Sequence, residues 1–252
     1  MASETTSAQA GVGRLGLCSG CSYFPDFLNG RRCTPGDACI RAHSGRQIDR
    51  FLRTNPGEAE NFLDDIFWER RAIAARYAPE DHIGTLQADN DEVVRRVVAS
   101  RLPLAQLGAM ARDPDREVRL TVASRLPEAQ LAALVTDPDY MIRATVARRL
   151  PHGQLARLAK DPEREVRKVV ASRLPPFALH MLAGDPEPEV RAVVAERALP
   201  GLATALLQDP EWWVRLAAVG NAPIEFLSPL LNDPEPEIRD AAKARLAEAN
   251  AA

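Results

Sequence analysis

The chain of 252 residues lacks several kinds of segment. It does not begin with a basic stretch and an apolar run, as a secretory signal does. No run approaches the roughly 18 consecutive apolar residues that a membrane-spanning helix requires. It has no glycine-rich phosphate loop with a lysine, no nucleophile elbow and no Ser/His/Asp pattern. We therefore expect a cytoplasmic protein with no membrane segment, no enzyme activity and no small-molecule substrate.

Cysteine is absent after residue 39, and all four cysteines lie close together, at Cys18, Cys21, Cys33 and Cys39. Glycine and proline residues among them permit the tight turns that bring thiols together. The first 53 residues carry a net charge of +3, whereas the remainder carries −6. These differences predict a separate cysteine-rich domain at residues 14–53, between a flexible N-terminus at 1–13 and a connecting helix at 54–64.

The rest of the chain repeats with a period of 24 residues. Asp-Pro begins at positions 113, 137, 161, 185, 209 and 233, and each pair is followed by Val-Arg or Ile-Arg at the same distance. Weaker copies begin at Asp65 and Asp89, which makes eight repeats over residues 65–252. A fixed period of this length predicts a solenoid in which each repeat buries its apolar side against the next.

One repeat encodes a longer and a shorter helix. Asp113 is a suitable N-cap and Pro114 a suitable first helical residue. Apolar residues follow at helical spacing until Pro127 ends the segment, so we expect an α-helix from near residue 114 to near 125. The remaining residues of the repeat, up to 136, are too few for a second full helix and predict one turn of α or 3-10 helix. The predicted fold class is all-α.

Two arginine ladders follow the same period. The first comprises Arg95, Arg119, Arg143, Arg167, Arg191, Arg215 and Arg239. The second comprises Arg101, Arg125, Arg149, Arg173, Arg197 and Arg245, and is interrupted at Asn221. We expect the first ladder to bond the repeating Asp or a helix-end carbonyl between adjacent repeats. We expect the second ladder either to interact with the helix dipole or to form a basic stripe that binds nucleic acid.

The sixth and seventh repeats depart from this pattern. Proline arrives one residue late in the sixth, at Pro200, and Trp212 and Trp213 replace small or charged residues in the seventh. We expect one of these tryptophans to fill a gap between repeats and the other to be an exposed binding anchor.

The spacing Cys-x2-Cys-x11-Cys-x5-Cys indicates metal binding more than disulfides, because the expected compartment is reducing. Zinc usually takes two close pairs of cysteines, and only the first pair here is close. An iron–sulfur cluster tolerates irregular spacing, and nearby arginines would offset its negative charge. The arginines in question are Arg14, Arg31, Arg32 and Arg41, and His43 is the one additional ligand candidate. Spacing alone leaves zinc and a cluster both open.

Taken together, the 24-residue motif Asp-Pro-x3-Val-Arg-x2-Val-Ala-x-Arg-Leu-Pro and the four-cysteine motif resemble the leucine-rich repeat variant proteins of nitrogen-fixing bacteria, over residues 14–247. The resemblance implies a right-handed superhelix of alternating α and 3-10 helices. It also implies a 4Fe–4S cluster ligated by Cys18, Cys21, Cys33 and Cys39, and a link to nitrogen fixation. It assigns no clear biochemical activity.

Two functional hypotheses follow. The first is an iron–sulfur helical-repeat protein that is a redox-linked or redox-sensing scaffold for a macromolecular partner, a protein rather than a nucleic acid. The alternative is a nucleic-acid-binding repeat whose N-terminal domain holds structural zinc or an iron–sulfur cluster.

Overall fold

The computed structural model describes residues 16–251, so the predicted flexible N-terminus and Arg14 lie outside the described residues. Every regular element within 16–251 is a helix, and the one extended pairing is an isolated bridge between Thr34 and Ala38. The predicted all-α class is therefore confirmed. The chain divides into two compact units, residues 1–126 and 127–252. The domain boundaries expected from the sequence at 14, 54 and 65 stay predictions.

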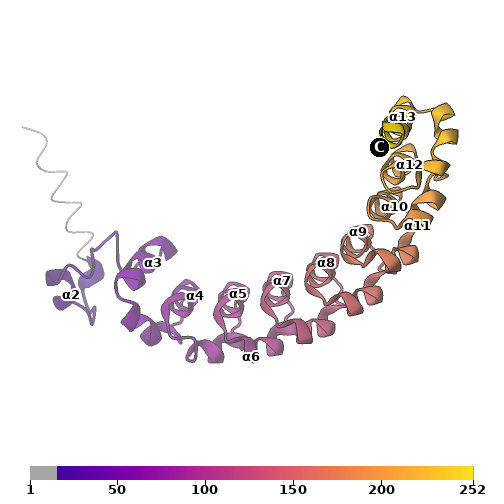
Figure 1. Cartoon of the computed structure of the whole chain (residues 1–252). Coiled ribbons are helices and arrows are strands. Elements are labelled where there is room, and N and C mark those ends of the chain that lie inside the picture. The colour runs from indigo at the N-terminus through magenta and orange to yellow at the C-terminus, as the bar shows by residue number, and fades with distance from the viewer. Residues whose placement is uncertain (1–15, 252) are drawn as a thin grey trace, which may run out of the picture. The chain divides into compact units, whose positions relative to one another are not determined.

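Unit 1 contains the cysteine segment and the first repeats. Its α-helices are α2 (Asp26–Asn29), α3 (Gly45–Thr54), α4 (Trp68–Tyr77), α5 (Glu92–Arg101), α6 (Leu104–Leu107) and α7 (Arg116–Arg125). Its 3-10 helices are η1 (Gly16–Cys18), η2 (Pro56–Phe62), η3 (Ile83–Ala88) and η4 (Gly108–Arg112). Within this unit α3, α4, α5 and α7 lie side by side in one row, and the shorter helices form a second row (Figure 1).

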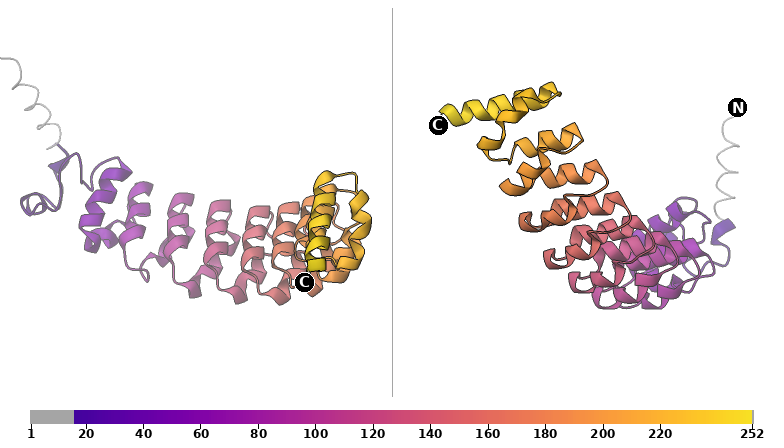
Figure 2. Two further views of the ribbon diagram at one scale, coloured as in Figure 1. Left: turned by 45° about the horizontal axis from the view of Figure 1, so that its top comes forward. Right: turned by 90° about the vertical axis from the view of Figure 1, so that its right-hand side faces the viewer.

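Unit 2 continues the same alternation. Its α-helices are α8 (Tyr140–Arg149), α9 (Arg164–Arg173), α10 (Pro188–Ala195), α11 (Pro200–Leu206), α12 (Trp212–Val219) and α13 (Pro236–Ala251). Its 3-10 helices are η5 (Glu128–Leu134), η6 (His152–Leu158), η7 (Pro176–Leu182), η8 (Ile224–Phe226) and η9 (Ser228–Asn232). The repeats of this unit follow one another as successive layers, with the longer α-helices side by side (Figure 2).

Each repeat contributes one thin layer of core. In the repeat of α9, the buried residues are Val166 and Val170 on the α-helix, Leu174 at its end, and Leu179 and Leu182 on η7, each at most 2% exposed. Burying such a side chain contributes about 1.5–3 kcal/mol. The same positions are buried in the neighbouring repeats, so stability is distributed along each unit rather than held in one central core.

The predicted start of the repeat helix is wrong by two residues. Helix α7 begins at Arg116, and its N-cap is Asp115, whose side chain accepts a hydrogen bond from the Val118 backbone N–H. Asp113 accepts instead from the backbone N–H of Asp115 and from the guanidinium of Arg95 in the preceding repeat. The carboxylate that was expected to cap its own helix therefore joins two repeats.

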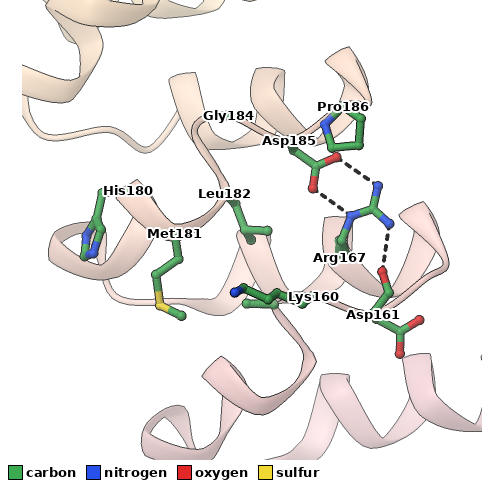
Figure 3. A pocket seen from close by; sticks show the side chains of 10 residues that line it. Lys160, Asp161, Arg167, His180, Met181, Leu182, Gly184, Asp185 and Pro186 are labelled. Carbon is green, nitrogen blue, oxygen red and sulfur yellow. Dashed lines mark hydrogen bonds and ion pairs between the residues drawn. The ribbon is translucent and has the colours of Figure 1, made fainter.

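The first arginine ladder forms this joint repeatedly, as predicted. Arg167 donates from Nε and Nη2 to the two carboxylate oxygens of Asp185, at 2.7 and 2.9 Å, and from Nη1 to the carbonyl of Asp161 at 2.8 Å (Figure 3). The side chains of Arg167 and Asp185 are 9% and 3% exposed. Equivalent pairs within the two units are Arg71–Asp89, Arg95–Asp113, Arg143–Asp161, Arg191–Asp209 and Arg215–Asp233.

The second ladder caps the helix of the preceding repeat. Arg173 donates to the carbonyl oxygens of Ala147 and Leu150, at 2.7 and 2.8 Å, where helix α8 ends. Carbonyls at a helix C-terminus accept no hydrogen bond from within the helix, so the arginine supplies the missing donor. Its positive charge also interacts favourably with the negative end of the helix dipole. Asn221, where the ladder is interrupted, makes the same kind of bond to the carbonyls of Ala195 and Glu196.

The irregular repeats alter the local structure. The late Pro200 begins helix α11, which is α-helical where the other repeats of unit 2 have 3-10 helix. The prediction that one tryptophan fills a gap between repeats is wrong. Trp212 and Trp213 are both exposed, at 37% and 38%. Their rings meet edge to face, with centroids 5.9 Å apart.

Candidate metal centre

The four cysteines line one cavity in unit 1. Its remaining wall is almost wholly apolar and consists of Leu17, Tyr23, Phe24, Pro35, Ile40 and Phe51. Cys39 is buried and the other three are half-buried, and all four are free thiols rather than disulfides. The structure therefore brings together the whole set of cysteines that the sequence predicts as ligands.

Tight turns on either side of the cavity aim the thiols inward. Gly20, between the first two cysteines, has φ +69°, and Gly36, between the last two, has φ +80°. Only glycine adopts such angles without a steric penalty. The first turn is closed by a hydrogen bond from the Cys21 N–H to the Cys18 carbonyl at 3.1 Å.

Helix α3 holds the second half of the cysteine segment in place. The Gln47 side chain donates from Nε2 to the Gly36 carbonyl at 2.6 Å. The Gln47 backbone carbonyl accepts from the Cys39 N–H at 3.1 Å. Ile48, Phe51 and Leu52 are the buried residues of α3, and Phe51 also lines the cavity. The cysteine loop therefore rests on a regular helix, which gives it a rigid support.

Asn55, at the end of α3, is a buried polar residue that the sequence did not single out. It is 2% exposed, and its Nδ2 donates to the carbonyls of Arg32 and Phe51 at 2.8 and 2.9 Å. Its Oδ1 accepts from Arg32 Nε at 2.8 Å. These bonds fix the backbone immediately before Cys33. In sequence, Asn before Pro56 looks like an ordinary helix end, so no local signal marks the role.

Aromatic rings form the wall behind the thiols. Tyr23 and Phe51 have ring centroids 5.4 Å apart, and Phe27 packs against both, at 4.5 and 6.0 Å. The Tyr23 hydroxyl donates to Glu58 on η2 at 3.1 Å. This apolar layer keeps water from that side of the thiols.

Burial and mutual repulsion both disfavour ionised thiols here in the absence of a cation. Burial, followed by the neighbouring thiols, raises the pKa of Cys18 and of Cys33 above the ordinary cysteine value. Arg41 opposes this effect for Cys18, and its guanidinium donates to the Ser19 carbonyl. A bound metal would stabilise Cys18 and Cys33 as thiolates.

The other predicted residues divide into near and distant groups. Arg41 lies by the first cysteine turn, as expected for a residue that offsets negative charge. Arg32 is engaged elsewhere, with Asn55 and over the Phe27 ring at 3.8 Å. His43 does not line the cavity and lies edge-on to Phe67, with centroids 6.1 Å apart.

The four cysteines around one cavity form an all-sulfur donor set that fits an iron–sulfur cluster. Zinc needs four ligands at about 2.0–2.3 Å from one centre. A cluster takes its thiolates at separated corners, which suits four cysteines around the wall of one cavity.

A groove on unit 2 provides a contrast. It lies at the Arg167–Asp185 pair, with Lys160, His180 and Met181 also lining it (Figure 3). The equivalent groove two repeats later surrounds the Arg215–Asp233 pair. Because the groove recurs with the repeat and its charged groups bind each other, it is a by-product of stacking.

The fold and the cysteine site together define a helical-repeat solenoid protein with an N-terminal segment that gathers four cysteines at one cavity. Residues 12–61 match the family described as "LRV protein FeS4 cluster". Residues 116–139 and 164–187 match the family described as "Leucine rich repeat variant". The chain is also similar to a solved structure described as a leucine-rich repeat variant with a novel repetitive structural motif. The identity is 53%, the match covers 91% of this chain and 98% of the other, and the TM-score is 0.85. The chain belongs to the leucine-rich repeat variant family, and its N-terminal segment is the family's iron–sulfur domain.

A curated relative adds genomic context. It is described as an uncharacterized 27.7 kDa protein in the nifB 3' region of Rhodobacter capsulatus, and it is 40% identical over 86 residues. The match covers 34% of this chain and 35% of the relative, about a third of each. Within residues 16–251, no helix is long and apolar enough to cross a membrane.

Proposed function

We propose that Cys18, Cys21, Cys33 and Cys39 hold a 4Fe–4S cluster, and that the helical repeats form a binding scaffold for a protein partner. The observation that carries the proposal is one cavity lined by all four cysteines of the chain, inside the segment that matches the family's iron–sulfur domain. A bound 4Fe–4S cluster supplies one-electron redox chemistry. The protein is accordingly a redox-linked or redox-sensing scaffold and not an enzyme.

The residues around the cavity have separate tasks in this proposal. The four thiolates bind, Gln47 and Asn55 hold the loop that carries Cys33 and Cys39, and the aromatic wall excludes water. Arg41 places a positive charge beside the first cysteine turn. Hydrogen bonding, charge and solvent exclusion around the sulfurs are the levers with which a protein sets a cluster's potential.

A protein partner is favoured over nucleic acid. Nucleic-acid binding requires arginines free to reach phosphates. In unit 2 Arg173, Arg197 and Arg245 donate to backbone carbonyls, and residues 54–252 carry a net charge of −6. The curated relative's description places its gene beside nifB, and we propose that this protein likewise works alongside nitrogen fixation.

The cluster is tested by anaerobic purification followed by visible spectroscopy and iron, sulfide and zinc analysis. The expected result is a brown protein with about four irons and four sulfides per chain. Cys33→Ser should lose them, whereas the control Ser19→Ala, which lies between two ligands, should keep them. About one zinc per chain without sulfide would overturn the cluster.

The scaffold is tested by retention of partners from anaerobic lysate on the immobilised full chain. The expected result is a protein retained by the iron-loaded wild type, with an amount retained that differs between dithionite-reduced and ferricyanide-oxidised protein. Retention of RNA or DNA alone, or of no protein in either state, would refute a redox-linked protein scaffold.

A further inference from the structure

Helix α12 presents a surface unlike those of its neighbours. Residues three and four apart share one face of a helix. On α12 this face consists of Trp213, Leu216 and Ala217, and it ends at Gly220, so it carries no charge. Trp213 and the adjacent Trp212 are exposed, while Leu216 and Ala217 are half-buried. These four residues, Trp212, Trp213, Leu216 and Ala217, are called the α12 face.

Carboxylates flank the α12 face on both sides. Helix α12 packs between α10 and α13, and the three lie side by side (Figure 2). Of the positions corresponding to the α12 face, Glu189 on α10 and Glu237 and Asp240 on α13 are acidic, and the others are proline, alanine or valine. Glu196, directly after α10, corresponds to Gly220 and adds a further carboxylate. An apolar centre with an acidic rim is therefore built from three successive helices.

The negative charge of this region is not cancelled by its arginines. Residues 187–240 contain ten acidic and four basic residues. The four arginines are occupied: Arg191 and Arg215 by ladder aspartates, and Arg197 and Arg239 by backbone carbonyls. The surplus of negative charge consequently lies with the exposed and half-buried glutamates and with Asp240.

Two nearby cations neutralise the rim only in part. Lys243 lies 3.3 Å from Asp240, but both side chains are well exposed, and such a pair contributes little. Arg164 reaches one oxygen of Glu189 at 3.4 Å, and the other oxygen is buried without a hydrogen-bond partner within the described residues. Glu237 on α13 is exposed, so its carboxylate can bind a further cation.

We propose that the α12 face docks a protein segment with apolar side chains at its centre and lysine or arginine on both sides. This inference rests on the scaffold function proposed above. Exposed tryptophans supply large rigid contacts and attract cations over their rings. The acidic rim steers a basic segment toward them and repels phosphate groups of nucleic acids or anionic lipids.

The first test uses a defined probe, a 14-residue amphipathic peptide with leucine and phenylalanine on one side and lysine on the other. In Trp68→Phe protein the remaining tryptophans are Trp212 and Trp213, so fluorescence reports directly on the α12 face. We expect saturable binding that weakens with added salt. The same peptide with glutamate in place of lysine should not bind.

The second test compares variants by calorimetry with the lysine probe. Trp212→Ala/Trp213→Ala should weaken binding at least tenfold, and Glu189→Gln/Glu237→Gln should reduce its salt dependence. The matched control is Tyr140→Ala/Met141→Ala, at the same repeat positions on α8, where the side chains are 42% and 40% exposed. This control should bind like wild type, and circular dichroism checks that all variants are folded.

The outcomes separate this inference from the proposed function. Absence of probe binding, or an equal loss of affinity in the tryptophan and control variants, overturns the proposal that the α12 face is a docking site. A lysate partner retained equally by wild type and by Trp212→Ala/Trp213→Ala also overturns it and leaves the scaffold function standing. Cys33→Ser should bind the probe as wild type does, because the α12 face lies in unit 2 and the cysteines in unit 1.

Discussion

Removal of Arg167 measures how strongly one ladder pair stabilises the stack. Arg167 is buried and donates two hydrogen bonds to the Asp185 carboxylate. It also donates to the backbone carbonyls of Asp161 and Pro162. Arg167→Met leaves the Asp185 carboxylate buried without its cation and two carbonyls with fewer donors. Asp185 keeps only the backbone N–H of Glu187 as a partner.

Arg167→Met should lower the free energy of unfolding by about 3–5 kcal/mol, the usual consequence of removing one partner of a buried ion pair. Arg164, three residues earlier in the same helix, provides a matched control. Its side chain is 51% exposed, and its nearest carboxylate oxygens are 3.4–3.7 Å away. Arg164→Met should therefore cost at most about 1 kcal/mol. Arg167→Lys should lie between the two, since lysine cannot make the two parallel bonds.

Urea unfolding of the full chain, followed by circular dichroism, gives these free energies if the slope is unchanged among variants. If Arg167→Met and Arg164→Met agree within about 0.5 kcal/mol, the ladder is a by-product of stacking and not a source of stability. Asp185→Asn tests the same pair from the other side and should lose stability in the same direction.

Three further predictions follow from single contacts. The hydrogen bond from Arg215 lowers the pKa of Asp233, although burial opposes it. Its contribution to stability is present above the ordinary Asp pKa of about 4 and is lost as pH falls through the lower folded-state pKa, so the difference in urea midpoint between wild type and Asp233→Asn should shrink as pH falls below about 4. Gly220 has φ −59°, and an added Cβ would meet only the Ala217 carbonyl at 3.7 Å, so Gly220→Ala should raise the free energy of unfolding by about 0.4–1 kcal/mol; a decrease would contradict this. Asn55→Leu should cost about 1–3 kcal/mol and speed amide hydrogen exchange at residues 33–39, whereas the exposed Asn61→Leu should leave exchange unchanged.

The repeat period, the helical class and the cysteine set were predictable because their signals are local. Each 24-residue repeat carries its own apolar positions and its own proline stop, and a pattern repeated eight times averages out irregular residues. The four cysteines were identifiable as one group because they lie within residues 18–39 and the rest of the chain has none. The first ladder was predictable in kind, since a buried, regularly spaced arginine needs a regularly spaced partner.

The tertiary structure decided what depends on contacts between residues far apart in sequence. Asp113 appeared to be a helix cap until Arg95, 18 residues earlier, was found to hold its carboxylate. Asn55 acquires its role from the carbonyl of Arg32, 23 residues away. The two tryptophans are equally exposed because the neighbouring helices leave both uncovered. A sequence shows which groups must be satisfied, but which partner satisfies them depends on how the repeats stack.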